Sequence, residues 1–146
     1  MRTPFLRLAL AAFTCTALAN AVPALAETVT LKANLSGSQE VPPNDSKGKG
    51  EVTATYDSGS KKLAWKGNYS GLSGPPTAAH FHGPAASGKN AGIAIAIFGG
   101  QNAKSPFEGS ATLSDAQAKQ LLDGEWYVNV HTGAHAAGEI RGQLTK

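Results

Sequence analysis

Apolar and polar residues alternate along several short segments of the chain. In residues 28–36, Val29, Leu31, Ala33 and Leu35 alternate with polar residues. Successive side chains of a β-strand point to opposite faces, so this period of two predicts a strand with one buried face. We expect the apolar positions to face the protein core.

The same alternation returns further along the chain. Residues 50–57 and 61–72 both show it, and the turn-forming residues 57–60 lie between them, which predicts a β-hairpin. Residues 92–100 are apolar on both faces, which predicts a central or well-covered strand. Residues 125–131 and 138–145 predict two final strands.

One segment has the pattern of a short helix. Ser114 is followed three positions later by Gln117, as in a capping box, and Gly124 provides a stop signal. Three residues between them form an apolar face: Ala118, Leu121 and Leu122. We expect this helix to cover one end of the sheet. Many short strands with one helix predict an all-β fold, namely an antiparallel Greek-key β-sandwich with one short capping helix.

The N-terminus has the composition of a secretory signal peptide. Arg2 and Arg7 precede an apolar, alanine-rich stretch that ends in residues 24–26 with a small-x-small cleavage pattern. Residues 1–26 are therefore predicted to be removed, leaving one domain of residues 27–146. We expect a periplasmic or secreted protein with no membrane span after signal cleavage. Cys15 would be removed with the signal, so the mature chain would have neither a disulfide nor a thiolate metal ligand.

Charge gives no support for a nucleic-acid partner. Without Arg2 and Arg7, the 13 basic residues of the chain become 11, against 10 acidic residues. The remaining lysines are scattered, and no basic stripe with interleaved aromatic residues is present. Nucleic acid is therefore excluded as the expected partner.

The four histidines carry the most specific chemical pattern. They form two pairs beside glycine-containing turns: His80 with His82, and His131 with His135. His80 and His82 project from the same face of a strand, with Phe81 pointing into the core. His131 also lies opposite the predicted core side of its strand. If the two strands are neighbours, the imidazoles share one outer face and ring nitrogens can meet at a metal, with metal–nitrogen distances of about 2.0–2.1 Å. The alternative is a set of unrelated histidines on solvated strands.

We therefore predict a transition-metal site formed by surface histidines: His80, His82, His131 and His135. Copper is the favoured metal because imidazole sites bind Cu(II) most tightly among the divalent first-row ions, and zinc is the alternative.

Other sequence features give little evidence for catalysis. Residues 83–90 nearly match a phosphate-binding loop, but a strand pattern follows them instead of a helix, so we interpret them as a flexible loop. Glu40 is expected to be solvated, and Glu139 to form an exposed ion pair with Arg141. No catalytic residues are predicted, and we do not expect an enzyme.

Three blocks of sequence resemble a known family. They are LSGSQEVPP, AAHFHGPA and the final block from LSDAQAKQLLDGEWYVNVH to GEIRGQL, and in this order they are similar to the CHRD domain, named from chordin. The resemblance spans about Val29 to Leu144. It implies an extracytoplasmic β-sandwich whose histidine motifs correspond to His80, His82 and His131, while His135 corresponds less closely.

The resemblance also leaves two other functions open. Because this module occurs in secreted multidomain proteins, the chain could bind an envelope or extracellular protein without a metal. The His-x-His strand is also similar to the copper strand of copper/zinc superoxide dismutase, although the zinc loop and the cysteine pair of that enzyme are missing here. We predict an exported CHRD-domain protein that binds a transition metal, with the interaction module and the dismutase as alternatives.

Overall fold

The computed structural model describes residues 26–146, apart from the side chain of Gln101. The predicted signal peptide lies almost entirely outside these residues, so its removal stays a prediction. The described residues form eight strands: β1 (Thr28–Ser36), β2 (Lys49–Asp57), β3 (Lys62–Ser70), β4 (Pro76–His82), β5 (Ile93–Gly99), β6 (Phe107–Thr112), β7 (Tyr127–Thr132) and β8 (Ile140–Gln143). There are also one α-helix, α1 (Asp115–Leu122), and two short 3-10 helices, η1 (Gly37–Gln39) and η2 (Gly100–Asn102). None of the helices among the described residues is long and apolar enough to cross a membrane.

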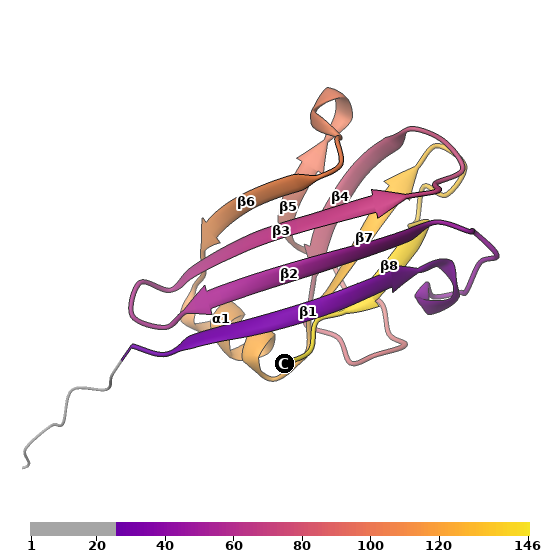
Figure 1. Cartoon of the computed structure of the whole chain (residues 1–146). Coiled ribbons are helices and arrows are strands. Elements are labelled where there is room, and N and C mark those ends of the chain that lie inside the picture. The colour runs from indigo at the N-terminus through magenta and orange to yellow at the C-terminus, as the bar shows by residue number, and fades with distance from the viewer. Residues whose placement is uncertain (1–25) are drawn as a thin grey trace, which may run out of the picture.

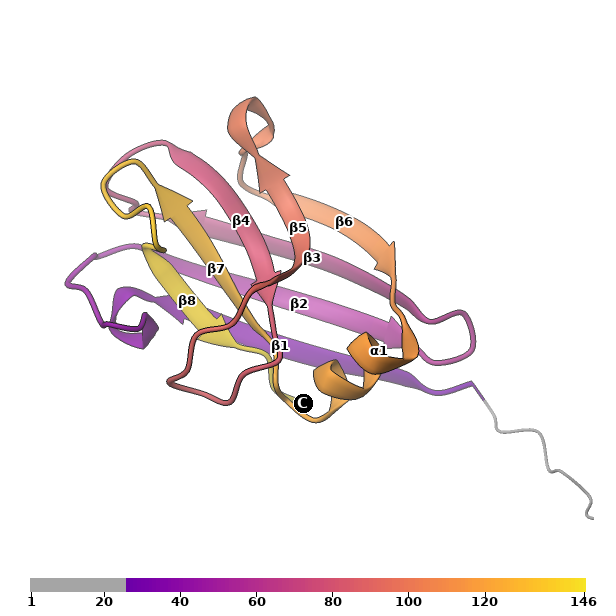
Figure 2. The ribbon, with the colours of Figure 1, turned by 180° about the vertical axis from the view of Figure 1, so that it is seen from behind.

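All eight strands belong to one antiparallel sheet that folds over on itself. Its strand order is β5-β4-β7-β8-β1-β2-β3-β6. Figures 1 and 2 show two crossing layers, one with β1, β2, β3 and β6 and the other with β4, β5, β7 and β8. They join where Ser36 of β1 pairs with Arg141 of β8, next to a bridge between Lys32 and Thr145. The predicted all-β, antiparallel fold with one short helix is confirmed.

The core lies between the two layers. In β1, Leu31, Ala33 and Leu35 are buried and the residues between them are exposed, as the alternation predicts. β2 and β3 form the predicted hairpin. Phe81 of β4 packs edge to face against Trp65 of the opposite layer, with ring centroids 5.1 Å apart. This contact confirms that Phe81 points inward.

The helix α1 begins as the sequence predicts. The side chain of Ser114 accepts a hydrogen bond from the backbone of Gln117, and the Gln117 side chain accepts one from the backbone N–H of Ser114. Ala118 and Leu121 are buried, so the helix packs its apolar face against the core. Gly124 follows with a φ of 77°, a conformation that glycine adopts without steric cost.

The prediction of a central, covered strand at residues 92–100 is wrong. β5 is an edge strand that pairs only with β4, and Ile93 is 59% exposed. Its far end still contributes to the core, because Phe98 packs against Phe107 of the other edge strand, β6, with ring centroids 5.4 Å apart. The apolar residues of β5 thus help to close the opening between the two sheet edges.

Candidate metal centre

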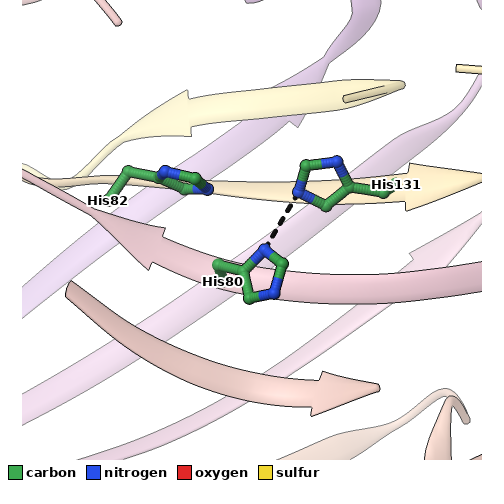
Figure 3. Close-up of side chains that lie close together, drawn as sticks. All are labelled: His80, His82 and His131. Atoms are coloured by element: carbon green, nitrogen blue, oxygen red, sulfur yellow. Dashed lines mark hydrogen bonds between the residues drawn. The ribbon is translucent and has the colours of Figure 1, made fainter. Parts of the chain in front are cut away.

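Two adjacent strands bring three of the four histidines together. β4 carries His80 and His82, and its antiparallel neighbour β7 carries His131, which pairs with Ala78. The condition for a shared site, that the two strands are neighbours, is therefore met. Because the inward-pointing Phe81 separates His80 from His82, both imidazoles lie on the outer face of the layer. Figure 3 shows the three rings gathered there.

The ring nitrogens are close enough to share an ion. One ring nitrogen from each of His80, His82 and His131 can be chosen so that all three lie within 4.8 Å of one another. Nδ1 of His80 lies 3.0 Å from Nε2 of His131. Two nitrogens bound to one metal at about 2.0–2.1 Å are themselves about 3 Å apart, so this pair already has the spacing of neighbouring ligands.

The backbone carbonyl of Ala136 fixes the tautomer of His131, and His131 in turn fixes that of His80. Nδ1 of His131 lies 3.0 Å from the carbonyl oxygen of Ala136, which can only accept a hydrogen bond. In the neutral ring, Nδ1 of His131 therefore carries the hydrogen and Nε2 keeps its lone pair. Nδ1 of His80 donates its hydrogen to that lone pair, as the dashed line in Figure 3 marks. A shift of the His80 hydrogen to its Nε2 would free Nδ1 for a metal.

His82 has the same arrangement and lies deeper. Its Nδ1 donates to the carbonyl oxygen of Ala91 at 3.0 Å, which leaves the lone pair on Nε2. That Nε2 is buried and has no hydrogen-bond partner among the described residues, and His82 as a whole is only 8% exposed. Buried polar nitrogens without a partner are rare, and a metal would satisfy this one.

The environment of His80 and His131 favours their neutral form, which a metal ligand must have. Burial, together with the neighbouring His131 and His82, lowers the pKa of His80 to about 4. Burial also lowers the pKa of His131, against the opposing effect of the hydrogen bond to Ala136. Protons therefore compete with a metal for these two rings only in acid solution.

His135 does not join the three other histidines. The cluster of possible ligands among the described residues contains only His80, His82 and His131. The backbone N–H of His135 donates to the carbonyl and hydroxyl oxygens of Thr132, which forms the turn after β7. This turn presents the carbonyl of Ala136 to His131, so the segment orients a possible ligand through its backbone.

The outer face of this layer is largely covered, contrary to the sequence prediction. Both faces of β7 are buried, including Tyr127 and Asn129 beside the histidines. The connection between β4 and β5, residues 83–92, lies against the layer in Figure 2 and makes several hydrogen bonds to it. This segment has no regular secondary structure, as expected of a loop, but hydrogen bonds attach it to the layer. Of the three clustered histidines predicted to lie at the surface, His82 is buried, and His80 and His131 are partly exposed.

Glu139 and Arg141 do not form the predicted exposed ion pair. Glu139 is 0% exposed and Arg141 is 2% exposed, and neither forms a salt bridge with another residue that the structure describes. The Arg141 guanidinium donates to the side-chain oxygen of Asn90 at 2.8 Å and to the carbonyl of Lys89 at 2.6 Å, and it lies 3.5 Å from the ring centre of Tyr127. The strand pattern predicted that solvent surrounds Arg141, but residues far along the chain contact it instead.

Glu40 is also buried, contrary to expectation, with 6% exposure. Burial raises its pKa to about 7, against the opposing effect of the nearby Arg141 guanidinium. Because the folded pKa lies above the value of the unfolded chain, ionisation of Glu40 favours unfolding, and stability falls as the pH rises from about 4.5 to about 7.

We expect Glu40→Gln to be more stable than the parent protein at pH 8, by about 2 kcal/mol, because the amide carries no charge to bury. At pH 4 the difference should largely vanish. Urea denaturation at the two pH values measures it. An equal change in stability at both pH values would contradict the prediction.

Sequence reasoning missed the residues that support the histidines. Tyr127 stacks on His82 with ring centroids 4.9 Å apart and planes 4° apart, and its hydroxyl lies within hydrogen-bonding distance of the Ala91 peptide. Asn90 and Arg141 hold the segment that carries Ala91. The one available signal was the strand period, which places Tyr127 on the same face as His131.

Comparison with known proteins identifies the family of the chain. Neither the curated proteins nor the solved structures contain a match. The family model of the CHRD domain matches residues 31–144, which include every strand from β2 to β8, most of β1 and all three clustered histidines. The chain belongs to the CHRD domain family.

Proposed function

We propose that this protein is an exported CHRD-domain protein that binds a transition metal, with copper favoured, through His80, His82 and His131. CHRD domains occur in extracellular and periplasmic proteins. The proposed role is binding and not catalysis. The observation that carries the proposal is the convergence of three imidazoles from two adjacent strands; the Nε2 of His82 is buried and has no hydrogen-bond partner among the described residues.

The donor set supports copper over other ions. Three imidazole nitrogens without a thiolate or a carboxylate suit Cu(II), and the order of divalent affinities places copper above zinc at such a site. Hydrogen bonds from His82 and His131 to backbone carbonyls would hold both rings with Nε2 toward the ion. Zinc remains the alternative and would bind more weakly.

The test is a titration of the mature protein with Cu(II), monitored by calorimetry and by EPR. We expect one tight site with nitrogen ligands, and His131→Ala should weaken it by at least about a hundredfold because the ion loses a central ligand. His135→Ala is the matched control, since His135 lies outside the cluster, and it should bind as the parent protein does.

Three outcomes would overturn the proposal or part of it. One is equal Cu(II) affinity in the parent protein and in His131→Ala, which would show that binding is adventitious. Another is capture of one envelope protein that is insensitive to chelator, with no metal bound, which would favour an interaction module. Dismutation of superoxide by the copper-loaded protein well above that of free copper would show that the role is not confined to binding.

A further inference from the structure

We propose that Asn90, Tyr127 and Arg141 form a clamp that fixes the carbonyl of Ala91 and thereby orients His82. These are positioning residues, because none of them belongs to the histidine cluster. The effect of this clamp on metal affinity rests on the proposed function, whereas its effect on the His82 ring does not.

The first part of the clamp holds the covering segment to β8. The two terminal nitrogens of Arg141 donate to the carbonyl of Lys89 at 2.6 Å and to the side-chain oxygen of Asn90 at 2.8 Å. The amide of Asn90 then donates to the carbonyl of Val41 at 3.0 Å. Asn90 thus links β8 to the connection between β1 and β2, and the next residue along the chain is Ala91.

The second part holds the Ala91 peptide itself. The hydroxyl of Tyr127 accepts from the backbone N–H of Ala91 at 3.2 Å and lies 3.3 Å from its carbonyl oxygen. That same oxygen accepts from Nδ1 of His82. The Tyr127 ring also lies under the Arg141 guanidinium and is stacked on His82, so one side chain touches both ends of the clamp.

The clamp determines which nitrogen of His82 has a free lone pair. Ala91 selects the tautomer with hydrogen on Nδ1, and the stacked Tyr127 ring restricts rotation of the imidazole. Without a fixed acceptor, a neutral histidine populates both tautomers, and the one with hydrogen on Nε2 cannot bind an ion through that atom. Loss of such supporting contacts lowers metal affinity by about 10–100-fold in proteins that depend on them.

The experiment compares three variants of the exposed residues 89 and 90. Asn90→Ala removes both side-chain contacts, Asn90→Asp keeps an acceptor for Arg141, and Lys89→Ala is the control because only the backbone of Lys89 is used. The nitrogen chemical shifts of His82 in the metal-free protein at pH 7.5 report its tautomer. Cu(II) affinity and thermal stability are measured on the same samples.

We expect His82 to carry its hydrogen on Nδ1 in the parent protein, in Asn90→Asp and in Lys89→Ala, and to become a tautomer mixture in Asn90→Ala. Cu(II) affinity should fall by about tenfold or more in Asn90→Ala alone. Unchanged His82 shifts in Asn90→Ala would overturn the clamp, even if the protein binds copper. Changed shifts in a protein that binds no metal would uphold the clamp and overturn the proposed function.

Discussion

Replacing Glu139 by alanine is expected to lower the free energy of unfolding by about 3–5 kcal/mol, because four hydrogen bonds to a buried carboxylate are lost. Both carboxylate oxygens accept two hydrogen bonds each. The donors are the hydroxyl of Ser46 at 2.7 Å, the backbone N–H and hydroxyl of Ser73 at 2.7 and 2.8 Å, and the hydroxyl of Thr132 at 2.6 Å. Glu139 thus ties β7 to the connections that follow β1 and β3. Its removal leaves the hydroxyl of the buried Thr132 without this acceptor.

The same contacts predict that the stability of the protein depends on pH. Burial alone would raise the pKa of Glu139, but the hydrogen bonds from Thr132, Ser46 and Ser73 overcome this effect and lower the pKa to about 2. Because the folded pKa lies below that of the unfolded chain, this stabilisation is complete above about pH 4.5 and is lost as the pH falls toward 2.

Urea denaturation at pH 7 and pH 3 tests both statements. The stability difference between Glu139→Ala and the parent protein should be smaller at pH 3. Glu51→Gln, a change at an exposed acidic residue, is the control and should stay within about 0.5 kcal/mol of the parent protein. A decrease of less than about 1 kcal/mol in the free energy of unfolding of Glu139→Ala at pH 7 would contradict the prediction. It would mean that water satisfies the donors as well as the carboxylate does.

Phe81→Ala is expected to destabilise the protein by about 3–5 kcal/mol, the usual cost of emptying a buried aromatic position. Phe81 is fully buried and contacts aromatic rings on two sides, Trp65 at 5.1 Å and Trp126 at 6.0 Å between ring centroids. Its substitution leaves a cavity between the two layers. The measurement is thermal or urea unfolding followed by tryptophan fluorescence.

Phe81→Leu is the matched control because it keeps an apolar side chain in the same place, and its loss of stability should be clearly smaller. Equal losses in the two variants would mean that the aromatic contacts, and not the filled volume, stabilise the contact between the layers. Because Phe81 lies between His80 and His82, its packing also keeps these two histidines on the outer face.

The local pattern of the sequence determined much of this structure. The alternation in residues 28–36 and 50–72 was sufficient to predict β1 and the β2–β3 hairpin. Successive side chains of a strand point to opposite faces, so a strand with one buried face must alternate apolar and polar residues. Ser114 and Gln117 predicted the start of α1, since a capping box is formed within four residues. The His-x-His spacing likewise predicted that His80 and His82 share a face.

Only the tertiary structure decided which strands are neighbours and what covers them. The sequence gives no register between β4 and β7, so the meeting of His131 with His80, and the exclusion of His135, depend on long-range pairing. The apolar pattern of β5 predicted a central strand, but an edge strand can also bury residues that face the core. Its position depends on the strands that pair elsewhere.

The buried polar face was the least predictable part. Polar residues such as Glu139 and Arg141 predict a solvated face when only the strand period is considered, because burying a charge without partners is costly. Here the partners come from distant segments: Ser46 and Ser73 for Glu139, and residues 89–90 for Arg141. Hydrogen bonds that form only in the folded chain make this burial possible, and no local pattern in the sequence predicts them.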